Sequence, residues 1–146
     1  MIKELLDYGS EVTLITRPRR FGKTINMSML KYFFENTSYL EARQNYQKND
    51  KLMLFRGLNI LNEGEEYLNQ AQQYPVIFLS FKSIKAKKFD IALNEIKIAI
   101  IKEYTRHSYL LQSKKLLNHE KNTFERIINK EGDRADYSHS LQYLSD

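Results

Sequence analysis

The fold prediction starts from residues 12–24, which read Val12-Thr-Leu-Ile-Thr-Arg-Pro-Arg-Arg-Phe-Gly-Lys-Thr24. The first five residues are apolar and β-branched, which is typical of a short buried strand. Pro18 and the basic residues around it indicate a loop. From Lys23 to about Glu35, apolar residues recur at helical spacing and predict a helix. Gly-Lys-Thr therefore falls between a predicted strand and a predicted helix, the context that a phosphate-binding loop requires.

The residues of this loop suit a phosphate chain. Backbone N–H groups and a partial positive charge at the helix N-terminus attract phosphate. Gly22 would let the backbone approach the ligand, Lys23 would reach the β- and γ-phosphates, and the Thr24 hydroxyl would join the coordination shell of Mg²⁺. The common pattern Gly-x-x-x-x-Gly-Lys-[Ser/Thr] has glycine where this chain has Arg17. The alternative interpretation is a basic helix N-terminus with Lys23 merely solvated.

Elsewhere in the chain, the spacing of apolar residues predicts one further strand and several helices. Residues 74–81 (Tyr74-Pro-Val-Ile-Phe-Leu-Ser-Phe81) form the clearest predicted strand, with Pro75 near its start. Short helix and turn are expected over 52–61, and residues 36–49 fit no clear pattern. Helices are predicted over Ile2–Tyr8, Glu63–Gln73, Phe89–His107, Ser113–Lys130 and Tyr137–Leu144. The order strand, helix, strand, helix predicts an α/β fold with a parallel sheet and right-handed crossovers.

Composition narrows the classes of function. The 146 residues suffice for one domain, and the net charge of +5 is compatible with an anionic ligand. The chain has no cysteine, so disulfide and thiolate chemistry are excluded, and its three histidines share no metal-ligand spacing. Its apolar runs are shorter than the roughly 18 residues of a membrane span. We therefore expect a cytoplasmic protein without membrane contact.

The loop and its helix, Thr16 to Glu35, closely resemble the predicted AAA-ATPase (AAA-ATPase-like) family of bacterial proteins. In that family the string Arg-Pro-Arg-Arg-Phe-Gly-Lys-[Ser/Thr] stands in for the usual loop, so Arg17 is no departure from it. The stretches Leu54–Ile60 and Tyr74–Lys82 are similar to the family's next two landmarks. The resemblance covers nearly the whole chain.

This resemblance implies an AAA-type P-loop NTPase fold, a three-layer sandwich with sheet order 5-1-4-3-2. Residues 12–16 would be strand 1 and residues 76–81 strand 2. It implies binding of ATP with Mg²⁺, and the preference for adenine rests on the resemblance alone. The expected nucleotide-binding residues are Arg19, Arg20, Phe21, Gly22, Lys23 and Thr24, with Thr24 also on the metal.

Relatives commonly continue into a Walker B strand resembling Leu-Ile-Asp-Glu-Tyr-Asp. No apolar strand ending in Asp-Glu follows Phe81 in this chain. We therefore expect residues 1–146 to be a partial domain, truncated before Walker B, that binds ATP without hydrolysing it alone. No catalytic residue can be named. The full-length protein could form a homo-oligomer.

Two further interpretations stay open. A basic nucleic-acid-binding module could use the four lysines of Phe81–Lys88, although such a run is more often a solvated loop. Tyrosines over Tyr32–Tyr46 could stack on bases, although packing in the core is the commoner role. The other interpretation is that the chain is an inert remnant of a longer ATPase or nuclease-like protein.

Overall fold

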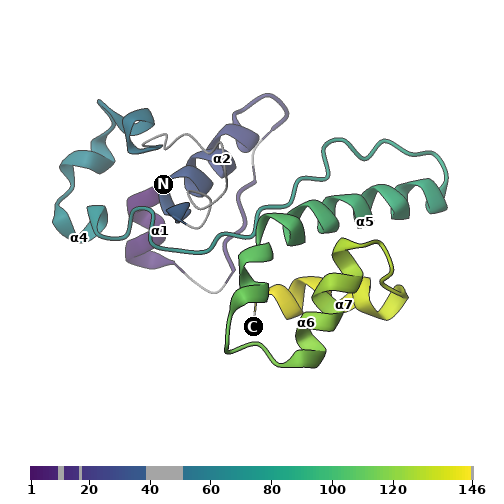
Figure 1. Cartoon of the computed structure of the whole chain (residues 1–146). Coiled ribbons are helices and arrows are strands. Elements are labelled where there is room, and N and C mark those ends of the chain that lie inside the picture. Colours follow the sequence, from purple (N-terminus) through teal and green to yellow (C-terminus); the bar gives the residue numbers. More distant parts are fainter. Residues whose placement is uncertain (10–11, 17, 39–50, 146) are drawn as a thin grey trace. The chain divides into compact units, whose positions relative to one another are not determined.

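The computed structural model describes residues 1–9, 12–16, 18–38 and 51–145 (Figure 1). It contains two compact units, Met1–Val76 and Ile77–Asp146, each with its own core. Within the described ranges the regular elements are helices, and no segment forms a strand of a sheet. The predicted α/β three-layer sandwich is therefore wrong for the described part of the chain. None of the helices found there is both long and apolar enough to cross a membrane.

The first unit is built from short helices. They are α1 (Ile2–Tyr8), α2 (Lys23–Phe34), the 3₁₀ helices η1 (Lys51–Phe55) and η2 (Asn59–Asn62), and α4 (Glu65–Leu68). The helices predicted at Ile2–Tyr8 and from Lys23 are confirmed, as are short helix and turn over 52–61. The helix predicted over Glu63–Gln73 is reduced to a single turn, α4.

The core of this unit centres on the C-terminal half of α2. Phe33 is fully buried and meets Phe34 and Phe55 edge to face, with ring centroids 5.1 and 5.4 Å apart. Such pairs add to the gain from burial alone. The other buried apolar residues are Ile2, Ile60, Tyr67 and Ala71. The prediction that Phe33 and Phe34 are core is confirmed, whereas Ile25, predicted on the same face, is 73% exposed.

Neither predicted strand forms. Residues 12–16 form no regular secondary structure, and Val12 and Leu14 are 81% and 83% exposed. β-branched residues fit a strand only where a neighbouring backbone pairs with it, and no described segment runs beside residues 12–16 as a strand. In residues 76–81, the Phe78 amide donates to the Glu103 side chain, with N and Oε1 2.7 Å apart. Glu35 and Tyr74 form an isolated parallel β-bridge, outside any strand.

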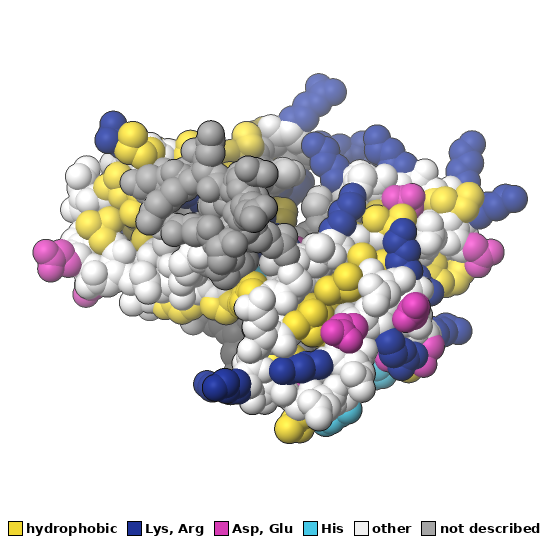
Figure 2. Space-filling model, viewed as in Figure 1, with side chains coloured by type: hydrophobic (Ala, Val, Ile, Leu, Met, Phe, Trp, Pro, Cys, Tyr) yellow, Lys and Arg dark blue, Asp and Glu magenta, His cyan; other side chains and the backbone are white. Residues whose placement is uncertain are grey.

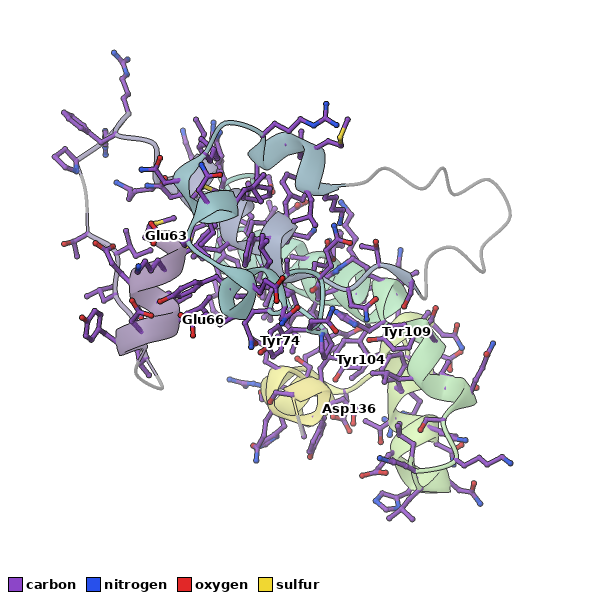
Figure 3. The ribbon with its side chains drawn as sticks, turned by 90° about the vertical axis from the view of Figure 1, so that its left-hand side faces the viewer. Glu63, Glu66, Tyr74, Tyr104, Tyr109 and Asp136 are labelled. Carbon is purple, nitrogen blue, oxygen red and sulfur yellow. The ribbon has the colours of Figure 1, made fainter. Side chains whose placement is uncertain are left out.

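The second unit is a group of three longer helices, α5 (Phe89–Arg106), α6 (Asn118–Ile128) and α7 (Arg134–Ser145), with the 3₁₀ helix η3 (Ser108–Gln112) after α5 (Figure 1). Tyr104 of α5, labelled in Figure 3, is its central residue. Its ring lies 4.6 Å from that of Phe124, and its hydroxyl donates to the Ser140 carbonyl at 2.6 Å. Burial raises the pKa of Tyr104 to about 12. The other buried apolar residues here are Ile100, Ile127 and Tyr137.

Capping contacts shift two helix boundaries from their predicted positions. The α6 helix begins at Asn118 instead of Ser113, because the Glu120 carboxylate accepts a hydrogen bond from the Leu117 amide and fixes the first turn there. The α7 helix begins at Arg134, three residues before the predicted Tyr137. Asp133 and Asp136 accept each other's amides at 2.9 Å, a reciprocal cap that sets this start. Helix α5 matches its prediction.

Candidate functional site

The segment that enters α2 is a tight turn with an unusual backbone. Arg20 and Gly22 both have left-handed conformations, with φ of 70° and 71°, and Phe21 between them does not. Where left- and right-handed residues alternate, successive backbone N–H groups can turn toward one side and line an anion-binding nest. A left-handed arginine is strained, and such strain is often kept at ligand sites. The turn therefore places two left-handed residues beside a helix N-terminus, and its Phe21 amide donates to the Pro18 carbonyl at 3.4 Å.

Gly22 leaves this turn open. It is the N-cap of α2, and no atom lies within 4 Å of the position that a Cβ would take there. With no side chain, Gly22 cannot cap the amides of the first helical turn, which have no partner inside the helix. The helix dipole adds a partial positive charge at the same place. An anion can thus approach the backbone beside Gly22 and meet N–H donors.

Lys23 and Thr24 are the first two residues of α2, and both side chains are exposed. The Lys23 Nζ donates to the Pro18 carbonyl at 3.1 Å, so this side chain turns back along the loop. The ammonium group is therefore held at this turn.

The structure thus brings the predicted site residues together on one exposed turn. Arg19, Arg20 and Phe21 are exposed, Phe21 by 63%. Arg17 lies outside the described residues. Residues 19–22 form a turn that leads into α2, and the strand predicted before it is absent from the described residues 12–16.

The donors available suit phosphate better than a bare metal ion. The described residues contain no cluster of three or more His, Asp or Glu side chains that could hold a metal ion. The exposed Thr24 hydroxyl is one oxygen ligand, and Mg²⁺ commonly combines one or two protein ligands with substrate phosphates and water. The residues present fit a nucleotide that brings Mg²⁺ with it.

A buried polar cluster in the second unit was not predicted from the sequence. Glu103 and His107 of α5 are 5% and 2% exposed, and the Arg106 guanidinium bonds to the Glu103 carboxylate. Burial by itself raises the pKa of Glu103, but hydrogen bonds from His107, Arg106 and the Phe78 amide lower it to about 2. The spacing Glu-x-x-Arg-His, which places all three on one helix face, is the signal that could have revealed the cluster. It ties the backbone of Phe78 to α5.

The basic run before α5 lies on the surface. Lys82, Lys85, Lys87 and Lys88 are all exposed, and Lys and Arg side chains stand out from the face seen in Figure 2. Exposure is common to a solvated loop and to a nucleic-acid contact, so it favours neither. Of the predicted tyrosine stretch, Tyr32 is 39% exposed, and residues 39–46 lie outside the described residues.

The turn, the open glycine and the lysine that follows it define a candidate phosphate-binding protein. The sequence model of a family described as Predicted AAA-ATPase matches residues 1–137 of the 146-residue chain. The chain belongs to this AAA-ATPase-like family, and the resemblance found in the sequence is confirmed. No curated protein and no solved structure matches the chain.

Proposed function

We propose that this chain binds the phosphates of ATP, together with Mg²⁺, at the turn Arg19–Thr24. The observation that carries the proposal is the open, left-handed Gly22 at the N-terminus of α2, followed at once by Lys23. Membership of a family of predicted AAA-ATPases supports ATP as the nucleotide.

Five residues of the turn have a role in this proposal. Gly22 leaves space for a phosphate beside the backbone, and the first-turn amides of α2 donate to it. Lys23 exchanges the Pro18 carbonyl for a phosphate oxygen, and Thr24 offers its hydroxyl to the metal. Arg19 and Arg20 add positive charge at the mouth of the turn. When bound, ATP supplies the phosphate oxygens that complete the coordination of Mg²⁺.

Calorimetry with Mg-ATP tests the proposal. Lys23→Ala should weaken binding by about 1.5–3 kcal/mol, the contribution of a hydrogen bond to a charged group. Lys114→Ala, which removes an exposed lysine in the second unit, is the matched control and should bind like the wild type. Both variants should retain the wild-type circular dichroism spectrum because both side chains are exposed. Equal affinities of wild type and Lys23→Ala would exclude this turn as the phosphate site.

We further propose that the 146-residue chain binds ATP without turning it over. Hydrolysis needs an acidic group that holds the metal and orients water, and the sequence has no Asp-Glu pair after an apolar run. Phosphate release should therefore stay at background at saturating Mg-ATP. Mg-dependent release that Lys23→Ala abolishes would show that the chain carries a catalytic acid of its own.

A further inference from the structure

The second unit contains a pocket that the proposed ATP site does not use. Its volume is about 220 Å³, and α5, α7 and the connection between α6 and α7 line it. Lys97, Lys130 and Asn94 supply its polar groups, and no Asp or Glu lines it. In the described part of the chain, neither lysine is within ion-pair distance of a carboxylate. Two lysines and an asparagine thus line one pocket, and no carboxylate lines it.

Lys130 occupies a position where glycine is usual. The amide of Glu131 donates to the Arg126 carbonyl at 2.8 Å, and the amide of Lys130 donates to the Ile127 carbonyl at 3.2 Å. These two bonds form a Schellman motif at the end of α6, which requires a left-handed residue and normally takes glycine. Lys130 adopts that conformation, with φ of 67°. A non-glycine residue in that conformation costs about 1–2 kcal/mol, and the favourable interaction of a lysine charge with the C-terminal end of the helix dipole offsets part of this cost.

The pocket also has apolar lining residues. The Lys97 ammonium lies over the Tyr137 ring, 4.6 Å from its centroid. Tyr137 belongs to the core of the unit, and Ile98 and Ile101 complete the apolar lining. The tyrosine ring therefore holds Lys97 at the pocket, and the isoleucines offer a surface for the organic part of a ligand.

From these features we propose that the pocket between Lys97 and Lys130 binds an organic phosphate monoester. Two lysines match the charge of a phosphoryl group, about −1.5 to −2 at pH 7. The Asn94 amide donates to a third oxygen, and the carbon chain or ring rests against Ile98 and Ile101. A carboxylate would neutralise only one of the two ammonium groups. This site is separate from the turn before α2 and does not depend on the proposed function.

Titration of ¹⁵N-labelled full chain with phenyl phosphate, followed by NMR, tests this site. The Asn94 side-chain amide and the Gly132 backbone amide should shift, and phenyl phosphate should bind more tightly than inorganic phosphate or benzoate. Lys23→Ala, in the other unit, should leave these shifts unchanged. Absence of shifts at both reporters would overturn the proposal, as would equal binding of phenyl phosphate and benzoate. Equal affinities for phenyl phosphate and inorganic phosphate would overturn the proposal that the pocket binds the organic part of the ligand.

Lys130→Gly separates a ligand role from a structural one. Glycine suits the left-handed position, so this variant should melt no lower than the wild type while its affinity for phenyl phosphate falls at least about tenfold, the effect of losing one charged hydrogen bond. Lys130→Arg keeps the charge and should keep the affinity within about threefold. Unchanged affinity in Lys130→Gly would overturn the proposal.

Discussion

Gly22 and Lys130 lie at two helix ends and share a left-handed backbone conformation. Gly22 has no side chain, whereas Lys130 has a long, positively charged one. Both residues are left-handed, with φ of 71° and 67°. Gly22 stands before α2 and leaves open space where a side chain would be. Lys130 stands after α6, where the backbone bonds of the Schellman motif are complete and glycine would serve them best.

The difference shows two ways in which a helix end can attract an anion. At the N-terminus of α2 the backbone itself provides donors and positive potential, so the position works when it has no side chain. At the C-terminus of α6 the helix dipole is unfavourable to anions, and positive charge has to come from side chains. Lys130 and Lys97 supply it there.

The largest effect expected concerns the core that holds the first of these helix ends. Phe33→Ala should lower the free energy of unfolding by about 3–5 kcal/mol, because it removes a fully buried aromatic ring from the core of the first unit. Ile25→Ala lies on the same helix at a side chain that is 73% exposed and should change stability by no more than about 0.5 kcal/mol. Urea denaturation measures both. Similar losses in the two variants would mean that α2 packs through another face.

Acid should act on the second unit, which carries Lys130. The pKa of Glu103 is lowered to about 2 in the folded state from 4.5, so its carboxylate stabilises the fold above the unfolded pKa. That contribution, on the order of 2 kcal/mol, should be lost as the pH falls from about 4.5 to about 2. Glu103→Gln should flatten this part of the stability curve measured between pH 5 and 2. An unchanged slope in Glu103→Gln would assign the acid sensitivity to other carboxylates.

Exchanging side chains at the two left-handed positions should change stability in opposite directions. Gly22→Ala introduces a Cβ at positive φ and should destabilise by about 1 kcal/mol, whereas Lys130→Gly should stabilise by about 0.5–1 kcal/mol. Thermal melts followed by circular dichroism would give both values. Destabilisation by Lys130→Gly would show that the lysine is retained for the fold and would weaken the contrast with Gly22.

A further effect of similar size is expected in the Mg²⁺ dependence of ATP binding at α2. Thr24→Ala should weaken Mg-ATP binding by about 0.5–1.5 kcal/mol and leave metal-free ATP binding unchanged, because only the hydroxyl is lost. Thr24→Ser keeps that hydroxyl and is the matched control. Calorimetry with and without Mg²⁺ measures the difference. Equal losses in both conditions would remove Thr24 from the metal site.

Sequence patterns predicted the helices well and the strands wrongly, for a physical reason. A helix satisfies its backbone within one segment, so the spacing of Phe89, Ile96, Ile100 and Tyr104 suffices to predict α5. A strand needs a second segment, and the β-branched residues 12–16 and 76–81 carry no information on whether one is present. The boundaries of α6 and α7 depended on caps by Glu120 and Asp133, which local periodicity does not show.

The two candidate sites differ in the same way: the sequence indicated the one that depends on neighbouring residues and did not indicate the one that depends on the fold. Gly22, Lys23 and Thr24 could be proposed from the sequence because their chemistry is local to one turn, and they lie at the start of α2. The pocket of Lys97 and Lys130 was not recognised, because it joins α5 to the end of α6 and only the folded chain brings those residues together. The left-handed Lys130 carries no sequence signal, since lysine is ordinary near a helix C-terminus.

The most direct test of the account is a residue-resolved NMR titration of the full chain with Mg-ATP. The account predicts that the backbone amides of Gly22, Lys23 and Thr24 shift at saturating nucleotide, and that Lys23→Ala weakens the response about tenfold or more. Shifts elsewhere with none at this turn, or an identical titration in Lys23→Ala, would contradict the assignment of the phosphate site.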